Sequence, residues 1–513
     1  MVIVGGGISG AAIAREASLL NLKVALVEKQ DFGGATSTST SKLIHGGLRY
    51  LKNREFSLVR ESLRERAQLL RLAPHLVYPL PFLLPTYKSS SNSKRVIQLG
   101  MRFYDFLAMG YRTFPDSSKN LPAHQMLSPE EAMALEPKIH LQELTGGALY
   151  YDCLSLNPER LTLCFLLSAC ERGAQVANYV KMLEFLREKN RVIGIRVRDE
   201  LSGENYDIRG RFIVNACGPW TDLVLAGTRE MKIVRSQGIH LITKKINQSR
   251  AIALQTPSKR HYFIIPWRGL SLIGTTDKPY NGPPDSYEVQ PEHIDEFLKE
   301  INATYDAQLT WNDIYYSYGG LRPLVDTQND SYKASRRYEI EDHEKEGIAG
   351  LITVVGGKYT TSRQLAENVL RLIFQKLEKS TSYEVSQQTP LYGGDIPLME
   401  EFVQQTLKEH PALDSTLLEQ ICRDRGTMYP KVLNLLEEAG SLLKAEVLYA
   451  IREEMAYHLN DIVFRRIPLA TTGQPTEIQA VADLAAQELH WSEDEKIREL
   501  LLFQKRYQVY RPT

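Results

Sequence analysis

The sequence "MVIVGGGISGAAIAREASLLNLKVALVEKQDF" (residues 1–32) predicts a strand, a glycine turn, a helix and a second strand. Residues 1–4 are a short apolar, β-branched run, and residues 11–20 have the composition of a helix. Residues 23–27 form the second apolar run. This order is one βαβ half of a doubly wound α/β sheet.

Three glycines and one acid in this stretch have the spacing of a dinucleotide-binding turn. Gly5, Gly7 and Gly10 form GxGxxG directly after the first strand, and Glu28 ends the second strand. Such glycines permit a tight turn, close approach of the backbone to a pyrophosphate, and close packing of helix on strand. The pyrophosphate then lies at the helix N-terminus, and Glu28 accepts hydrogen bonds from the ribose hydroxyls. A glycine-rich structural turn is the alternative, and the acid in register argues against it.

The glycines do not distinguish NAD from FAD, but two later features favour FAD. Six hydroxyl residues, "TSTSTS" (36–41), directly follow the second strand, where the second phosphate and ribityl chain of a flavin would pass. A second glycine turn at 356–357 precedes another helix, whose N-terminus could stabilise negative charge on a reduced flavin. A flexible Ser/Thr linker is the alternative for 36–41; it fits poorly with "KLIHGGLRYL", which follows at once.

Composition narrows the class of protein. The chain has 513 residues, enough for two to four domains, with 43% hydrophobic and 24% charged residues. Its formal net charge is zero, so we expect no nucleic-acid partner. Five scattered cysteines without a CxxC pair predict neither a disulfide framework nor a metal site. We expect a cytoplasmic protein, with attachment to the inner face of the cell membrane left open.

The pattern along the chain predicts a nucleotide-type domain that is interrupted and resumed, a strand-rich domain threaded between its parts, and a helical C-terminal domain. The predicted ranges are 1–78, 148–225 and 319–390 for the cofactor domain, 79–147 and 226–318 for the substrate domain, and 391–513 for the helices. Within the substrate domain, "HYFIIPW" and "LSLIGTTD" predict a hairpin with a turn at Arg268-Gly269.

Six motifs in this order, "GGGISGAAIA", "TSTSTSKLIHGGLRYL", "NACGPW", "IGTTD", "GGLRPL" and "GGKYTTSRQLAE", resemble those of FAD-dependent glycerol-3-phosphate dehydrogenases. The resemblance covers almost the whole chain. It implies a Rossmann-type FAD-binding domain of the glutathione-reductase and D-amino-acid-oxidase kind, with the inserted and C-terminal domains described above. Only residues 1–4 precede the glycine turn, fewer than usual in the family, which predicts either a short first strand or a clipped start of the sequence.

The resemblance also implies the reaction and the partners. Members oxidise sn-glycerol 3-phosphate to dihydroxyacetone phosphate and pass two electrons to a membrane quinone or an artificial acceptor, while a sister group gives them to oxygen. Carried over by motif, the expected FAD-binding residues are Gly5, Gly7, Gly10, Glu28, Thr36, Ser37, Ser41, Lys42, Leu43, His45, Gly218, Gly356, Gly357, Lys358, Tyr359 and Thr360.

A globally neutral protein needs a local cationic cluster to hold a phosphate that is close to dianionic at neutral pH. The candidates, each in or beside a glycine turn or loop, are Arg49, Arg322, Arg336 and Lys358. By resemblance Arg336, or the arginine that follows it, meets the phosphate, with Arg49, Tyr50 and Lys358 nearby. Arg322 would lie closer to the reacting carbon. For each cation a surface salt bridge is the alternative.

Oxidation of an alcohol requires a base for the hydroxyl proton, and histidine has a suitable pKa. His240 in "SQGIHLIT" and His45 in "LIHGG" are the candidates. The resemblance places His240 beside the substrate and His45 beside the flavin. The pKa of Arg322 is too high for a base, so this residue would instead stabilise alkoxide charge. A satisfied structural histidine is the alternative for either imidazole.

The route to the acceptor, the assembly and the reaction class stay open at this level. The segment 95–111 could lie at a membrane interface or pack as a plain amphipathic helix, and Arg465 and Arg466 could meet anionic lipid. A homodimer is an open possibility. Rival functions are an oxygen-using oxidase of the same substrate or of another hydroxy or amino acid, and a non-catalytic flavin-binding sensor. An NAD-dependent dehydrogenase is less favoured, because it would leave the hydroxyl run without a purpose.

Overall fold

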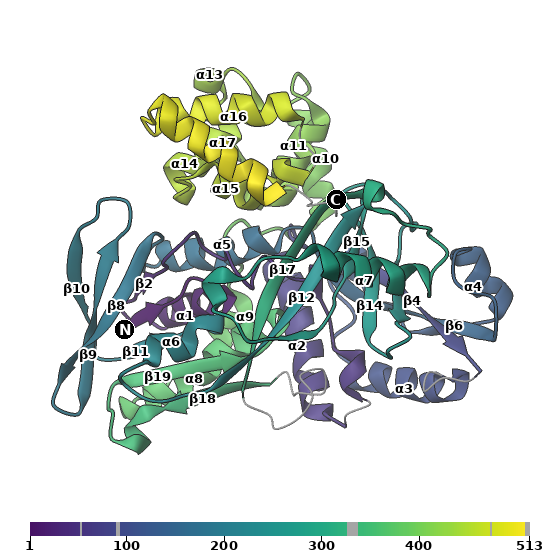
Figure 1. Ribbon diagram of the computed structural model, residues 1–513, viewed down its shortest axis with the longest axis horizontal. Coiled ribbons are helices and arrows are strands. Elements are labelled where there is room, and N and C mark those ends of the chain that lie inside the picture. The colour runs from purple at the N-terminus through teal and green to yellow at the C-terminus, as the bar shows by residue number, and fades with distance from the viewer. Residues whose placement is uncertain (52–53, 89–92, 326–336, 472–473, 508–513) are drawn as a thin grey trace.

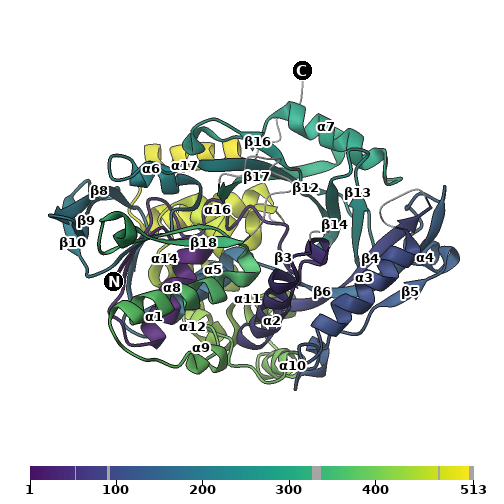
Figure 2. The same cartoon turned by 90° about the horizontal axis from the view of Figure 1, so that it is seen from below.

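The computed structural model describes residues 1–51, 54–88, 93–325, 337–471 and 474–507. Two sheets with their covering helices form the larger part of the molecule, and a block of helices from the end of the chain lies on one side of it (Figure 1). The same block lies behind the two sheets in the perpendicular view (Figure 2).

The first sheet has six strands and carries the glycine turn. Its order is β18 (Tyr338–Asp342), β19 (Leu351–Gly356), β11 (Ile213–Asn215), β1 (Val2–Val4), β2 (Ala25–Val27) and β7 (Gln175–Ala177), parallel except for the β18–β19 pair. The predicted βαβ unit and its short first strand are confirmed.

Three helices pack together with this sheet in one apolar core. They are α1 (Ile8–Leu19), α5 (Pro158–Cys170) and α8 (Ser362–Lys376). Helix α5 begins as predicted: the Asn157 side chain accepts a hydrogen bond from the Arg160 N–H, and Pro158 occupies the first turn. Helix α1 is buried on nearly all sides, which explains its run of alanines.

The second sheet has ten strands. It runs β16 (Lys278–Tyr280), β12 (Ile233–Thr243), β15 (Leu270–Gly274), β14 (His261–Trp267), β13 (Ala251–Gln255), β4 (Val77–Tyr87), β6 (Leu144–Ser155) and β3 (Leu43–Ile44), with β17 (Ile314–Val325) on β12 and β5 (Gln125–Leu127) on β6. The predicted hairpin is confirmed as β14–β15. Its covering helices are α2 (Phe56–Leu72), α3 (Lys94–Leu107), α4 (Pro129–Leu135) and α7 (Pro291–Asn302).

The second sheet extends beyond the ranges that the sequence predicts for it. Strand β17 pairs with β12 up to Val325, past the predicted return at residue 319, and β3 pairs with β6 although it lies within 1–78. The two glycines at 319–320 do not interrupt β17, because each is opposite a residue of β12 in the antiparallel ladder. A separate three-stranded sheet, β8 (Val180–Glu188), β9 (Arg191–Asp199) and β10 (Asn205–Arg209), projects at one edge (Figure 1).

After β19 the described residues form helices without further strands. The C-terminal block consists of α10 (Met399–Glu409), α11 (Ser415–Arg425), α12 (Tyr429–Leu433), α13 (Leu436–Ala439), α14 (Leu442–Glu454), α15 (Leu459–Asp461), α16 (Pro475–Glu488) and α17 (Glu493–Tyr507). Two short helices outside this block lie beside the first sheet in Figure 1: α6 (Thr221–Leu225), which precedes β19, and α9 (Glu384–Gln388), which follows it. Within the described ranges, no helix combines the length and apolarity that crossing a bilayer requires.

The expectation that Arg465 and Arg466 meet anionic lipid is wrong. Both side chains are buried, at 6% and 1% exposure, and both pair with the Asp31 carboxylate. A sequence of two adjacent arginines does not reveal whether a carboxylate from a distant part of the chain faces them. Here the carboxylate comes from the cofactor domain, more than 400 residues earlier.

Candidate active site

The turn between β1 and α1 has no room for side chains. Gly5 has φ +108°, and a Cβ atom there would lie 2.6 Å from the Ala216 carbonyl oxygen. A Cβ atom on Gly10 would lie 1.9 Å from the Gly5 carbonyl oxygen, so this glycine serves the packing of helix on turn. The first turn of α1 contains no acid, which keeps its N-terminus favourable for an anion.

Glu28 lies directly beside this turn. Its carboxylate accepts hydrogen bonds from the Gly6 N–H at 2.7 Å and from the Gln30 N–H at 3.0 Å. Burial raises the pKa of the Glu28 carboxyl, while the two N–H donors lower it. The acid and the glycine turn therefore share one polar pocket.

A cavity of about 700 Å³ opens over the turn. The expected FAD-binding residues that line it are Gly5, Gly7, Glu28, Thr36, Ser37, Gly218, Gly356, Gly357, Lys358 and Tyr359. The Ser37 hydroxyl accepts a hydrogen bond from the Ile8 N–H at 2.9 Å, which ties the hydroxyl run to the start of α1. Residues from five separate stretches of sequence thus meet at this cavity.

A second cavity, of about 880 Å³, continues from the first. The two share Thr36, Thr40 and the turn at 356–359, so together they form one long slot. The predicted residues that line the second cavity but not the first are Ser41, Leu43, His45, Arg49, Tyr50, His240, Arg322 and Thr360. The structure therefore brings the predicted catalytic and substrate residues to one end of the slot that begins at the glycine turn.

Three predicted residues lie elsewhere. Gly10 packs against Gly5 rather than lining a cavity. The Lys42 side chain turns to the reverse side of the hydroxyl run, where its Nζ donates to Glu159 Oε1 at 2.9 Å. Arg336 lies outside the described residues; its neighbour Arg337 lines the second cavity and donates to the Ser57 hydroxyl at 2.9 Å.

His240 and Arg322 stand on neighbouring antiparallel strands. In the β12–β17 ladder His240 faces Tyr318 and Ser236 faces Arg322. Two glycines make room for the long side chains, because a Cβ on Gly238 would lie 2.1 Å from the Arg322 guanidinium. A Cβ on Gly274 would likewise lie 2.1 Å from the His240 ring.

The His240 imidazole is almost fully buried, at 1% exposure. Its Nε2 shares a 2.9 Å hydrogen bond with the Ser41 hydroxyl, and its ring stacks on Tyr318 with a centroid separation of 4.9 Å. Its Nδ1 makes no hydrogen bond among the described residues. Burial, with Arg322 and Lys42 nearby, lowers the pKa of His240 well below its usual value, so the ring is neutral at neutral pH.

Arg322 is oriented mainly by neutral oxygens. Its Nη2 donates to the Thr275 hydroxyl at 2.6 Å and its Nη1 to the Thr276 carbonyl at 3.2 Å. The Asp277 carboxylate lies 3.8 Å away and receives a 2.7 Å hydrogen bond from Ser236. The Arg322 side chain keeps 23% exposure, so its charge faces the cavity.

Lys358 supplies a second, half-buried cation. Its Nζ donates to the Ser62 hydroxyl at 2.7 Å and lies 4.1 Å from the centre of the Tyr50 ring, on which Arg49 also stacks. Burial lowers the pKa of Lys358 to about 7, against the opposing effect of Glu61 and other carboxylates. The protonation of Lys358 at neutral pH therefore depends on the groups around it.

The loop that carries His45 is held by an acid, Asp152, which is not among the predicted site residues. The Gly46 N–H donates to Asp152 Oδ1 at 2.9 Å, and the same carboxylate pairs with the buried Arg66. Burial lowers the pKa of His45 to about 4, with a further decrease from Lys358. An aspartate inside the apolar run "LYYDCLS" was the available signal for this support.

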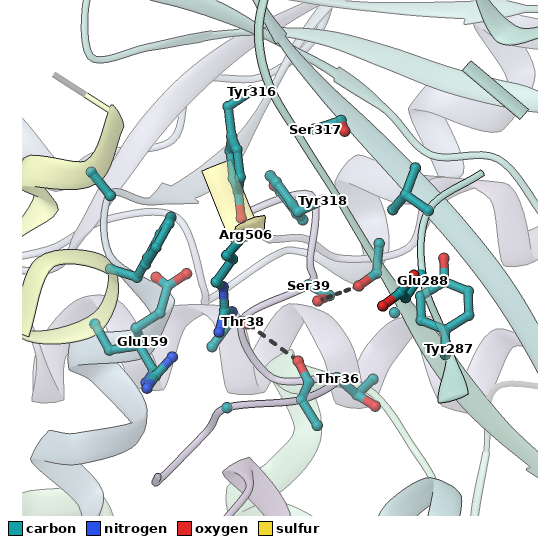
Figure 3. A pocket seen from close by; sticks show the side chains of 18 of the residues that line it. Thr36, Thr38, Ser39, Glu159, Tyr287, Glu288, Tyr316, Ser317, Tyr318 and Arg506 are labelled. Carbon is teal, nitrogen blue, oxygen red and sulfur yellow. Dashed lines mark hydrogen bonds between the residues drawn. The ribbon is translucent and has the colours of Figure 1, made fainter. Parts of the chain in front are cut away.

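A third cavity, of about 960 Å³, lies behind the hydroxyl run (Figure 3). The side chains of Thr36 and Ser39 point toward β17 and donate to the carbonyl oxygens of Leu321 and Gly319, at 2.7 and 2.8 Å. The Tyr318 hydroxyl donates to the Thr40 carbonyl at 2.7 Å. The hydroxyl run thus separates the third cavity from the slot formed by the first two, and hydrogen bonds attach it to β17, the strand that carries Arg322.

Comparison with known proteins agrees with this arrangement. Residues 1–362 match the family model described as "FAD dependent oxidoreductase", and residues 384–496 match the "C-terminal domain of alpha-glycerophosphate oxidase". The chain is 36% identical to a glycerol-3-phosphate dehydrogenase of Synechocystis sp. over 94% of this chain and 91% of that protein. It is 33% identical to an aerobic glycerol-3-phosphate dehydrogenase of Staphylococcus aureus, over 91% and 86% respectively.

A solved structure also resembles the whole chain. The glycerol-3-phosphate dehydrogenase of Bacillus halodurans, complexed with FAD, has a TM-score of 0.80 and 26% sequence identity, covering 99% of this chain and 96% of that one. The L-alpha-glycerophosphate oxidase of Mycoplasma pneumoniae shares the fold at a TM-score of 0.55. The predicted fold class and the family resemblance are confirmed.

Proposed function

The chain belongs to the FAD-dependent oxidoreductases and, within them, to the glycerol-3-phosphate dehydrogenase family, and we propose that it oxidises sn-glycerol 3-phosphate to dihydroxyacetone phosphate. The observation that carries this proposal is the cluster of Arg49, His240, Arg322 and Lys358 around one cavity. That cavity is continuous with the slot over the glycine turn. A base, an electrophilic cation and phosphate-binding cations therefore lie at the end of a cofactor site.

The residues present fit FAD. The open N-terminus of α1 and the glycines that admit close approach suit its pyrophosphate, and half-buried Glu28 suits the adenosine ribose. The slot of two cavities reaches from this turn to His240, which suits an extended dinucleotide. When bound, FAD supplies the ring that takes the hydride from substrate C2.

The protein's part in this reaction is to bind, orient and accept a proton. Lys358 and Arg49, which share the Tyr50 ring, are the proposed partners of the phosphate, together with Arg336 or Arg337. Arg322 is the proposed donor to the C2 oxygen, where it stabilises the charge that develops as the proton leaves. His240 takes that proton on Nδ1, because its Nε2 is engaged with Ser41.

The mouth of the second cavity supports a lipid-soluble acceptor. It is bordered by exposed apolar side chains of α2 and α3: Phe56 (44% exposed), Val96 (56%), Leu99 (71%) and Phe103 (36%). Arg95 and Arg102 flank these residues on α3, as in helices that lie at an anionic membrane surface. We propose that this face contacts the membrane and that a membrane quinone takes the electrons.

The substrate is tested by the visible spectrum of the anaerobic holoenzyme before and after addition of glycerol 3-phosphate. We expect the flavin band to bleach. Glycerol without phosphate, as the matched control, should leave the band unchanged at the same concentration. A band that persists with glycerol 3-phosphate contradicts the substrate and favours a different hydroxy or amino acid, or a sensor.

The acceptor is tested by reoxidation of the reduced enzyme. Rapid reoxidation by a soluble quinone analogue, with slow reoxidation by air and little peroxide, is the expected result; stoichiometric peroxide selects the oxidase instead.

For the membrane contact, Leu99→Asp should reduce co-sedimentation with anionic vesicles. Leu201→Asp, at an exposed leucine in the turn after β9, is the matched control, and equal losses would refute this face.

A further inference from the structure

Asp31 lies three residues after the ribose-binding acid Glu28 and is buried, at 2% exposure. Neither the sequence motifs nor the proposed reaction assigns it a role. A buried carboxylate carries a large desolvation penalty unless it is paired and hydrogen-bonded. Its partners therefore indicate what the side chain is for.

The charged partners come from the C-terminal helical domain. Arg466 donates from Nη2 to Asp31 Oδ1 at 2.7 Å and from Nη1 to Oδ2 at 2.8 Å, a bidentate pair. Arg465 donates from Nε to the same Oδ2. Asn178, at the end of β7, donates to Oδ1 at 3.1 Å and also to the Met455 carbonyl. The arginines hold the pKa of the Asp31 carboxyl far below its usual range.

On its other side, the turn 28–33 folds back onto the glycine turn. Besides the bond from Gly6 to Glu28, the Gly33 N–H donates to the Gly6 carbonyl at 3.0 Å. A Cβ atom on Gly6 would lie 2.7 Å from the Phe32 ring, so the two turns are in direct contact. Asp31 stands between this contact and the C-terminal arginines.

We propose that Asp31 is a positioning residue for FAD: through Arg465 and Arg466, the C-terminal helical domain holds the turn 28–33 and so keeps Glu28 in place for the adenosine ribose. The domain is then a part of the cofactor site rather than a separate cap. The proposal rests on the FAD cofactor and is independent of the substrate and the acceptor.

The same junction contains a second buried pair that serves as an internal control. Glu454 receives hydrogen bonds from Arg160 of α5, at 2.9 Å for Nη2, and from Arg425, at 2.6 Å. It also is fully buried and joins the same two parts of the chain. Among the described residues its carboxylate bonds to Arg160 and Arg425 and not to the turn 28–33, so Glu454→Gln removes the same charge and leaves every hydrogen bond of Asp31 in place.

The experiment compares Asp31→Asn and Glu454→Gln holoenzymes with the unaltered protein. FAD release on serial dilution is followed by flavin fluorescence, and thermal unfolding in saturating FAD is followed by circular dichroism. We expect both variants to unfold at lower temperature. Only Asp31→Asn should raise the dissociation constant of FAD, by about tenfold, as for a turn that holds the competent arrangement about a tenth of the time.

Equal FAD affinity in the two variants would overturn the proposal, because Asp31 would then contribute to stability alone. If Asp31→Asn does not accumulate as folded holoenzyme, Arg465→Lys takes its place, since it keeps the charge and loses the planar fork. A smaller rise in the FAD dissociation constant is expected for Arg465→Lys. An unchanged constant in that variant would likewise overturn the proposal.

Discussion

Two clusters of cations inside this protein differ in what surrounds them. At the junction, Arg160, Arg425, Arg465 and Arg466 meet the carboxylates of Asp31, Glu446, Glu454 and Asp461. In the cavity, Arg322 and Lys358 are oriented mainly by hydroxyl and carbonyl oxygens and by an aromatic ring, with the Asp277 carboxylate 3.8 Å from Arg322.

The difference shows how burial of charge serves two purposes. A guanidinium that is paired with a carboxylate has its charge balanced within the fold, and the pair holds two parts of the chain together. A cation that is oriented mainly by neutral oxygens and stays partly exposed to a cavity is equally well oriented and still faces an anionic ligand. The junction cluster is therefore expected to act on stability, and the cavity cluster on binding and rate.

The largest expected effect tests the junction. Glu454→Gln leaves Arg160 and Arg425 with a neutral partner in a buried site, so the free energy of unfolding should fall by about 3–5 kcal/mol. Urea denaturation of the holoenzyme measures this loss. Turnover per bound flavin should stay the same, and a loss of turnover without a loss of stability would reverse the assignment of the cluster.

Arg322→Met should lower kcat/KM for glycerol 3-phosphate by about 10²–10³-fold, because it removes the donor to the developing alkoxide. Flavin content and the unfolding midpoint should change little. Arg235→Met is the matched control: it lies on the neighbouring strand β12, and its guanidinium pairs with Asp222 and donates to the Pro219 carbonyl. A comparable loss in that control would mean that any arginine of this strand pair supports activity.

His240→Gln should slow flavin reduction by about 10²-fold, since the hydroxyl proton loses its acceptor. The pKa of His240 lies well below its usual value, so this imidazole stays neutral across the range from roughly pH 8 to roughly pH 6. In the unaltered enzyme, lowering the pH through that range should therefore cause no loss of rate through protonation of His240. Stopped-flow reduction against pH checks both statements. His293→Gln, at a partly exposed histidine of α7, is the control.

The smallest expected effect concerns Lys358, whose pKa is lowered to about 7. Below that pH the amine is a cation and binds phosphate; above it the charge is lost, so kcat/KM should fall as pH rises. Lys358→Met should raise KM by about tenfold, the loss of one charge-assisted hydrogen bond. Lys358→Arg should keep the charge and flatten the alkaline fall, whereas a profile unchanged in both variants would exclude Lys358 from phosphate binding.

The sequence predicted those parts of the site that depend on local pattern. The GxGxxG turn, the acid Glu28 and the strand–turn–helix order are local, because a glycine spacing acts on the backbone that carries it. The motifs around His45, His240, Arg322 and Lys358 were also sufficient to predict residues that the structure brings to one cavity. Lys42 was misplaced, since its left-handed backbone conformation (φ +57°) and its pairing with Glu159 cannot be read from a run of hydroxyl residues.

The sequence by itself determined the family, the cofactor class and a set of residues that line the slot. The tertiary structure alone decided which charges are available. Asp31, Arg465 and Arg466 look like ordinary surface residues in the sequence, and each is buried against a partner far along the chain. The physical reason is that a charged side chain is either paired within the fold or available to a ligand, according to the groups within a few ångströms of it. Packing between distant segments of the chain decides which groups those are.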